Sequence, residues 1–224
     1  MLCLRAASLC RLVGASQALT IAHRGPIELF QHLCTNAPRT IKVMDVDHLL
    51  WLDLEMTGLD VKNDQILEMA CILTDRNLNV ICEGMNLTVH QPDSVLENMD
   101  DWCKLNHEKS GLTQAVRNSK VSLAEAESKV IETIKPHLKG EVVLAGNTVY
   151  MDKLFIEHHM KRLHSLLHYR IIDVSSIKEL CRSWNPQCFV EVTKLKRQLH
   201  RGIDDIEDSI KELQYYKTHL FKTF

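Results

Sequence analysis

The chain has 224 residues, enough to bury a sizeable core, and its length indicates one domain with an appendage. Its hydrophobic share of 45% and charged share of 25% are those of an ordinary globular protein. A net charge of -2 argues against a broad basic surface for long nucleic acid. It does not exclude a short oligonucleotide, which offers few phosphates to neutralise.

The first forty residues differ in composition from the rest of the chain. No acidic residue precedes Glu28, whereas arginines, leucines, alanines and serines are frequent. An acid-free, modestly amphipathic leader resembles a mitochondrial transit peptide, and a disordered extension is the alternative. Its apolar stretches are too short to span a membrane. We therefore expect a mitochondrial leader over 1–43 and a domain over 44–224, with a start at Met44 as a hypothesis for a second, cytoplasmic form.

Eight cysteines are scattered through the chain, and no two of them form a CxxC pair. Cys71 lies inside an apolar, strand-like run. The pattern predicts free thiols in a reducing compartment, with neither a zinc site nor a disulfide framework.

Three strands are predicted in the first half of the domain. His48 to Met56 alternates in polarity, so Leu50 points one way while Asp53 and Glu55 point the other. A nearly continuous apolar run suits a central strand, and a short polar turn separates it from a third strand. The second and third strands are expected over 65–74 and 79–90.

Helices and strands alternate in the second half, which predicts an α/β fold: a mixed five-stranded sheet flanked by helices. The clearest helix begins at Ser122, which serves as N-cap with Glu125 closing a capping box. We expect helices over 92–107, 122–134, 151–167, 175–184 and 203–220, strands over 142–145 and 170–174, and an irregular segment over 185–199. No Gly-rich phosphate loop follows a strand, which argues against a nucleotide-cofactor fold.

A few acidic and imidazole side chains carry the chemical signal. Asp53 and Glu55 leave the same strand face, and paired hard oxygen ligands suit magnesium or manganese. An exposed polar strand face is the alternative, weakened by the apolar surroundings. Asp152, taken alone, is better explained as an ordinary acid at a helix N-terminus. His200 and Asp205 lie little more than one helical turn apart at the start of the last helix, although a lone histidine is more often structural.

The order and spacing of three motifs resemble the DEDDh family of 3'-to-5' exonucleases, which has a ribonuclease H-like fold. Further segments narrow the resemblance to the oligoribonucleases, and the segment around Tyr169 is the most specific because metal chemistry does not require it. The three motifs are Asp53-Leu-Glu-Met-Thr-Gly-Leu59, Gly146-Asn-Thr-Val-Tyr-Met-Asp152 and His200-Arg-Gly-Ile-Asp-Asp205. The further segments are WLDLEMTGLD at 51–60, SGL at 110–112 and HYRIIDVS at 168–175.

The resemblance implies two-metal-ion catalysis. Two divalent ions, Mg²⁺ or Mn²⁺, about 4 Å apart would be held by four acids. His200 would remove the proton of the attacking water, and the product would be a 5'-mononucleotide. The four acids are Asp53, Glu55, Asp152 and Asp205.

The resemblance also implies how the bases are held. A leucine matching Leu59 wedges between the two bases, and an aromatic residue matching Trp102 lies at the base pocket with His107 nearby. Core packing is the alternative for Leu59 and Trp102, and periodicity does not exclude it.

A second set of residues implies a length limit. Residues matching Arg170, Ser175 and Tyr169 close over the terminal phosphate, and Thr148 is a substrate contact. Tyr169 comes from the partner subunit in the family, so the resemblance implies a homodimer. The substrate implied is short single-stranded RNA, with dinucleotides favoured.

Some positions depart from the family pattern, which puts efficiency in doubt more than reaction type. Thr148 stands where the family usually has Ser, and Gly202 where it usually has Ala, while Tyr150-Met151 and Gln198-Leu199 are also unusual.

We expect a 3'-to-5' exoribonuclease that hydrolyses very short RNA. A divergent paralogue that binds short RNA without efficient cleavage is the alternative. A proofreading or DNA-trimming exonuclease shares the metal site, and the Tyr169 segment argues against it.

Overall fold

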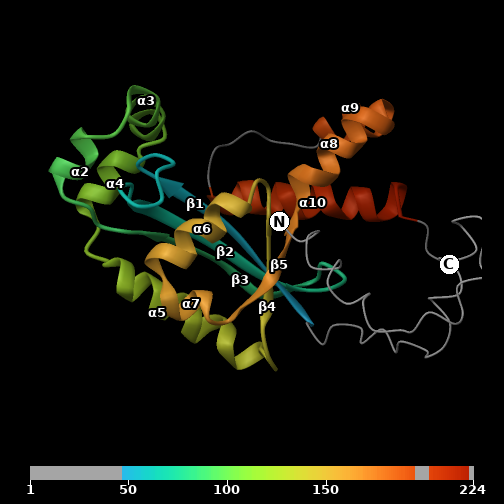
Figure 1. Cartoon of the computed structure of the whole chain (residues 1–224), viewed down its shortest axis with the longest axis horizontal. Coiled ribbons are helices and arrows are strands. Elements are labelled where there is room, and N and C mark those ends of the chain that lie inside the picture. Colours follow the sequence, from blue (N-terminus) through green and yellow to red (C-terminus); the bar gives the residue numbers. More distant parts are fainter. Residues whose placement is uncertain (1–46, 195–201, 222–224) are drawn as a thin grey trace, which may run out of the picture. The chain divides into compact units, whose positions relative to one another are not determined.

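A five-stranded mixed sheet forms the centre of the computed structural model, which describes residues 47–194 and 202–221 (Figure 1). The strand order is β3-β2-β1-β4-β5, in which β1–β2 and β2–β3 are antiparallel and β1–β4 and β4–β5 are parallel. The strands are β1 (His48–Met56), β2 (Ile66–Asp75), β3 (Val80–Thr88), β4 (Val142–Gly146) and β5 (Leu167–Asp173). The expected α/β fold with a mixed five-stranded sheet is confirmed.

Some predicted features fall outside the described residues. They are the leader over 1–43, the hypothetical start at Met44, the unusual pair Gln198-Leu199, and the histidine His200.

The alternation along β1 divides the core into two layers. Leu50, Leu52 and Leu54 pack into one hydrophobic cluster, and Leu49 and Trp51 pack into the other. The strand therefore has the face assignment that its sequence predicts.

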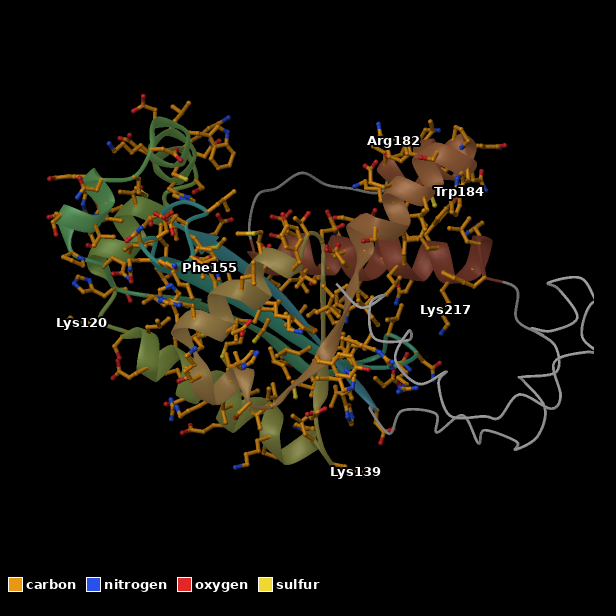
Figure 2. All side chains as sticks on the ribbon, in the orientation of Figure 1. Lys120, Lys139, Phe155, Arg182, Trp184 and Lys217 are labelled. Carbon is orange, nitrogen blue, oxygen red and sulfur yellow. The ribbon has the colours of Figure 1, made fainter. Side chains whose placement is uncertain are left out.

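The first layer is covered by α5 (Leu123–Ile134), α6 (Tyr150–His159) and α7 (Lys161–His164), and the short helix η1 (Lys135–His137) follows α5. Helix α5 begins with the predicted capping box. The Glu125 N–H donates to Ser122 Oγ at 3.3 Å, and the Ser122 N–H donates to Glu125 Oε2 at 2.7 Å. On α6, Phe155 is fully buried in this layer (Figure 2).

The second layer is covered by α8 (Val174–Trp184), α9 (Pro186–Thr193) and α10 (Gly202–His219). Helix α10 packs closely because its first residue lacks a side chain. A Cβ on Gly202 would lie 2.6 Å from the Cβ of Ala70 on β2. Glycine here therefore permits a close approach of α10 to the sheet.

Three short helices build a separate cap: α2 (Asp93–Glu97), α3 (Asp101–Lys109) and α4 (Leu112–Asn118). Their apolar side chains cluster on Leu67 of β2. Helix α4 was not predicted. The predicted helix over 92–107 is wrong as one element, because Asp100 accepts the Cys103 N–H at 2.7 Å and caps a new helix at that point.

Two other boundaries differ from the expectation. The predicted helix over 151–167 breaks at Met160, whose φ of -127° and ψ of 67° are not helical, and Leu167 already belongs to β5. Within the segment predicted to be irregular, Pro186 begins α9, and the Asn185 side chain caps it by accepting the Cys188 N–H at 3.2 Å. A proline fits the first turn of a helix, where its missing donor is not needed.

The five cysteines within the described ranges are all free thiols, as expected. No helix in the same part of the chain is long and apolar enough to cross a membrane.

The capping box predicts a measurable stability change. We expect Ser122→Ala to lower the free energy of unfolding by about 1 kcal/mol, because the Glu125 N–H loses its acceptor. Ser94→Ala on α2, another exposed serine, serves as control and should change it by less than about 0.5 kcal/mol. Chemical denaturation measures both, and equal effects would contradict a special role for the box.

Candidate active site

Carboxylates gather where β1 meets β2 and helix α10. Asp53 and Glu55 leave β1 on the side that α10 covers, and Asp205 lies in the first turn of that helix. In the antiparallel register, Ala70 lies opposite Asp53 and Glu68 lies opposite Glu55. The small Ala70 side chain leaves room for the start of α10, so the helix brings its acid toward the strand.

Asp152 reaches the same place from α6. It is the third residue of that helix, is 7% exposed, and its Oδ1 accepts the Leu54 N–H at 2.8 Å. The parallel pairing of β1 with β4 runs only from Leu49 to Trp51, so the Leu54 N–H lies beyond the last strand partner. The carboxylate supplies the acceptor that a neighbouring strand would otherwise supply.

Asp53 is the electrostatic centre of the cluster. Its pKa lies well above the ordinary value, first because the carboxyl is buried and then because other acids repel its charge. Those acids are Asp152, Glu55, Asp205 and Glu68, in decreasing order of effect. The structure therefore brings the other three predicted acids within electrostatic reach of Asp53.

Burial also raises the pKa of Asp152, to about 7. The hydrogen bond from the Leu54 N–H opposes this shift, and the charges of Glu55 and Asp173 add to it. Buried carboxylates that repel one another favour either protonation or a bound cation.

The donor set fits a hard divalent cation, since all four groups offer carboxylate oxygens. Among the described residues, no three His, Cys, Asp or Glu side chains are already arranged around one metal position. Glu55 and Asp205 are only partly buried, so a cation from solvent could reach the cluster.

Sequence reasoning missed Glu68, which completes the acidic cluster. Its Oε2 accepts from the Thr88 hydroxyl at 3.2 Å, so the side chain is held across β2 and β3. The hairpin register that places it opposite Glu55 is the signal that could have found it.

A pocket of about 480 Å³ lies beside these acids and contains three predicted base-contact residues. Leu59 is 69% exposed and Trp102 is 70% exposed, so core packing does not explain either side chain. His107 is buried, and its Nε2 donates to the Met56 carbonyl at 2.9 Å while its Nδ1 lies 3.9 Å from Glu55 Oε2. The pocket therefore opens onto one of the carboxylates.

A tight turn after β1 presents Leu59. The Thr57 hydroxyl and the Asp60 N–H donate to the two oxygens of Asp64, at 2.7 and 2.8 Å. A Cβ on Gly58 would lie only 2.4 Å from Asp64 Oδ2, so the turn needs glycine there. The motif residues after Glu55 thus build the wall of the pocket.

The predicted phosphate contacts lie in the turn after β4, in the first turn of α8 and on the edge strand β5. The hydroxyl oxygens of Thr148 and Ser175 are 3.2 Å apart. On β5, Tyr169 is 68% exposed, and the Cζ of Arg170 lies 5.0 Å from the centre of its ring. His200, the predicted base, lies outside the described residues.

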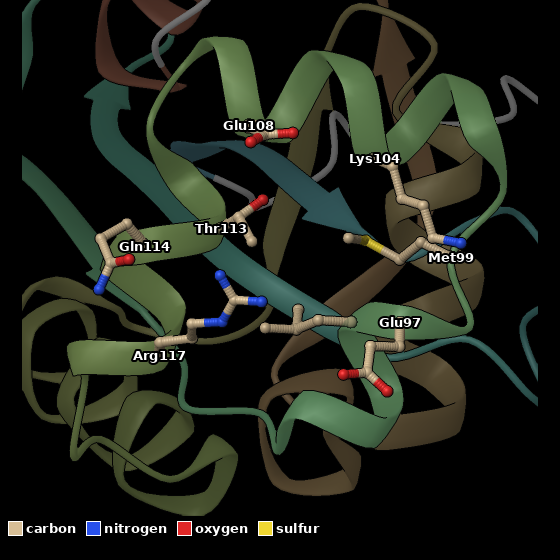
Figure 3. A pocket seen from close by; sticks show the side chains of 8 residues that line it. Glu97, Met99, Lys104, Glu108, Thr113, Gln114 and Arg117 are labelled. Carbon is tan, nitrogen blue, oxygen red and sulfur yellow. The ribbon is translucent and has the colours of Figure 1, made fainter.

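A separate hollow of about 310 Å³ lies among α2, α3 and α4 (Figure 3). Lys104, Glu108 and Arg117 line it with mixed charges. None of the predicted site residues borders it, so it forms no part of the candidate site.

Comparison with known proteins places these motifs in a family. The model of a family described as "Exonuclease" matches residues 50–213. The mitochondrial oligoribonuclease of Mus musculus is 51% identical over 175 residues, which are 78% of this chain and 73% of that protein. The oligoribonuclease of Marinobacter nauticus is 48% identical, over 79% of this chain and 97% of that protein.

Solved structures support the fold. Exonuclease I from Methylocaldum szegediense matches with a TM-score of 0.60 at 18% identity, over 78% of this chain. An E. coli exonuclease I complex with an oligonucleotide matches with a TM-score of 0.62 at 16% identity. The present chain spans 41% of each of those chains, so the likeness concerns the exonuclease fold alone. With the family model and the sequence relatives, the carboxylate cluster and its neighbouring pocket identify the chain as a member of the exonuclease family and, within it, of the oligoribonucleases.

Proposed function

We propose that this chain completes RNA decay by hydrolysing dinucleotides to 5'-mononucleotides. As a member of its family it is a 3'-to-5' exoribonuclease that acts on short RNA. The preference for dinucleotides rests on one observation: the pocket between Leu59 and Trp102 opens directly onto Glu55 of the acidic cluster. Its volume of about 480 Å³ is that of a small-ligand site, which suits a short oligomer.

Two divalent cations, Mg²⁺ or Mn²⁺, are part of the proposal. Asp53, Glu55, Asp152 and Asp205 would hold them. Bound in this cluster, they would supply a nucleophilic water and stabilise charge on the phosphate. The raised pKa values of Asp53 and Asp152 support this assignment, because a cation would relieve the repulsion that raises them.

The protein's own groups would then orient the substrate. Leu59 and Trp102 would hold the bases, and His107 would support the pocket wall through its bond to the Met56 carbonyl. The hydroxyls of Thr148 and Ser175, with the guanidinium of Arg170, would bind the terminal phosphate. His200 would accept the proton of the attacking water.

A homodimer is the proposed assembly, with Tyr169 acting in the partner's site. Support comes from the position of Tyr169 on β5, an edge strand with an exposed side. Trp184, at the end of α8, is 77% exposed (Figure 2). Large exposed aromatic side chains are typical of protein interfaces.

Mitochondria are the proposed location, supported by the leader composition and by relatives named as mitochondrial. A second, cytoplasmic form beginning at Met44 has no support from these relatives. They also do not favour the alternative that the chain binds short RNA without efficient cleavage.

The activity is tested with labelled RNA of two to about seven nucleotides in Mg²⁺ or Mn²⁺. We expect the dinucleotide to be cleaved fastest, and Asp205→Ala to lower the rate at least about a hundredfold through loss of a metal ligand. A DNA series of the same lengths distinguishes this activity from that of a DNA-trimming exonuclease, which would cleave the DNA series as well. Tight binding of the dinucleotide without product would contradict the proposal.

The acidic cluster predicts that removing one of its charges raises the stability of the protein and lowers its activity. The pKa of Asp152 is about 7 in the folded protein, above its ordinary value. Ionising a group with a raised folded pKa destabilises the protein, so this cost appears as pH rises from about 4 through 7 and is absent below that range. At pH 8 in EDTA, we expect Asp152→Asn to raise the free energy of unfolding by a few kcal/mol, and with divalent cation present we expect the same change to abolish cleavage.

Denaturation with and without divalent cation measures this effect. Glu132 is an exposed acid on α5, and Glu132→Gln is the matched control. It should change neither the free energy of unfolding nor the rate of cleavage. Cation should stabilise the wild type more than Asp152→Asn. Equal stabilisation of the two proteins would contradict cation binding at this cluster.

The shared site predicts complementation between two inactive subunits. Tyr169→Ala and Asp205→Ala proteins, mixed equally and allowed to exchange, should regain up to about a quarter of wild-type activity, because one site of each mixed dimer is intact. Asp53→Asn mixed with Asp205→Ala is the control and should stay inactive, since both changes lie in one subunit's cluster. Exchange without regained activity would contradict a Tyr169 supplied by the partner.

A further inference from the structure

One carboxylate oxygen joins two loops beside the candidate site. Asp173 ends β5, and its Oδ1 accepts the Ser175 N–H at 3.0 Å, which caps α8. The same oxygen accepts the Thr148 N–H, also at 3.0 Å. Capping α8 requires only the first bond. The second bond ties the start of α8 to the turn between β4 and α6, which lies 25 residues earlier in the chain.

The tethered residue has an unusual backbone. Thr148 has a φ of +57°, in the left-handed region that a β-branched residue rarely adopts. Such a conformation costs on the order of 1–3 kcal/mol and persists only where the surroundings hold it. The bond from the Thr148 N–H to Asp173 is one such restraint, and the Thr148 carbonyl accepts the Met151 N–H at 3.1 Å in the first turn of α6.

The consequence is a fixed pair of hydroxyls. Thr148 Oγ1 lies 3.2 Å from Ser175 Oγ, and Ser175 Oγ donates to Asn147 Oδ1 at 3.1 Å. Asn147 Nδ2 donates to Ser209 Oγ at 2.6 Å, and Ser209 Oγ donates to the Asp205 carbonyl at 2.8 Å. A continuous hydrogen-bond chain therefore links the hydroxyl pair to the turn of α10 that carries an acid of the cluster.

We propose that Asp173 is a positioning residue for the exonuclease reaction: it sets the spacing of the Thr148 and Ser175 hydroxyls so that both can turn their protons from their present partners to the terminal 5'-phosphate of the substrate. This inference rests on the proposed function, which gives those hydroxyls their ligand. Asp173 itself touches no substrate atom and acts through the two backbone N–H groups it holds. Without it, Thr148 loses a restraint on its strained conformation and its hydroxyl leaves Ser175.

The test compares two dinucleotides, one with a 5'-phosphate and one with a 5'-hydroxyl. In the wild type we expect a lower KM for the phosphorylated substrate. In Asp173→Ala, KM for that substrate should rise about tenfold or more, with little change in kcat, because a misplaced contact weakens binding of the phosphate. The KM for the 5'-hydroxyl substrate should stay nearly constant, so the preference disappears.

Three companion variants separate positioning from general destabilisation. Asp173→Asn keeps an oxygen acceptor and should restore most of the preference, which also excludes an effect of charge alone. Asp173→Ser can still cap α8 but has a shorter side chain, so it should fold and yet lose the preference as alanine does. Ser122→Ala removes a cap of similar value on α5 and should leave both KM values unchanged.

The outcomes are distinct. A wild type that prefers the 5'-phosphate, with Asp173→Ala or Asp173→Ser keeping that preference, overturns the positioning role and leaves the proposed function intact. A wild type that cleaves neither dinucleotide overturns the proposed function, and the inference with it. If the preference for the 5'-phosphate is lost in Asp173→Ala and Asp173→Ser and recovered in Asp173→Asn, the inference is supported. A purely structural role would change the stability and not the ratio of the two KM values.

Discussion

Repulsion among the carboxylates around Asp53 is the constraint on which the rest of the site depends. Burial and neighbouring acids raise the pKa of Asp53, so the cluster opposes its own ionisation. A fold tolerates such a cluster only when the surrounding structure holds it in place. Here β1, α6 and α10 each contribute an acid, and two hydrophobic layers fix those three elements against the sheet.

The mixed topology of the sheet creates the opening for this cluster. The pairing of β4 with β1 ends at Trp51, so the end of β1 has no strand neighbour on the β4 side. Asp152 accepts the Leu54 N–H there instead. On the other side, the antiparallel β2 adds Glu68 opposite Glu55. One strand end therefore supports acids from several parts of the chain.

The substrate side is built from two turns that specific side-chain contacts hold in place. Gly58 allows the tight turn that exposes Leu59 beside the pocket, because any side chain there would meet Asp64. Thr148 has a left-handed backbone and is tied to Asp173. A strained backbone such as that of Thr148 is typical of functional sites, where the surrounding structure holds it in place.

The sequence by itself determined the elements whose signals are local. The alternation from His48 to Met56 predicted β1 to the residue, and the Ser122 capping box predicted the start of α5. No proline or glycine marks the break at Met160 in the sequence, and that side chain is fully buried in the first layer of the core. Helix α9 carried a local signal, Asn185 before Pro186, that the irregular reading of the segment overlooked.

The same division holds for the candidate site. Motif spacing predicted the acids Asp53, Glu55, Asp152 and Asp205, since side-chain type and order carry that signal. Only the tertiary structure placed Glu68 beside them and joined Asp173 to Thr148, because those relations depend on strand register and on contacts between distant loops. A linear pattern contains the donors of a site, whereas the distances and electric fields between them arise when the strands pair and the helices pack.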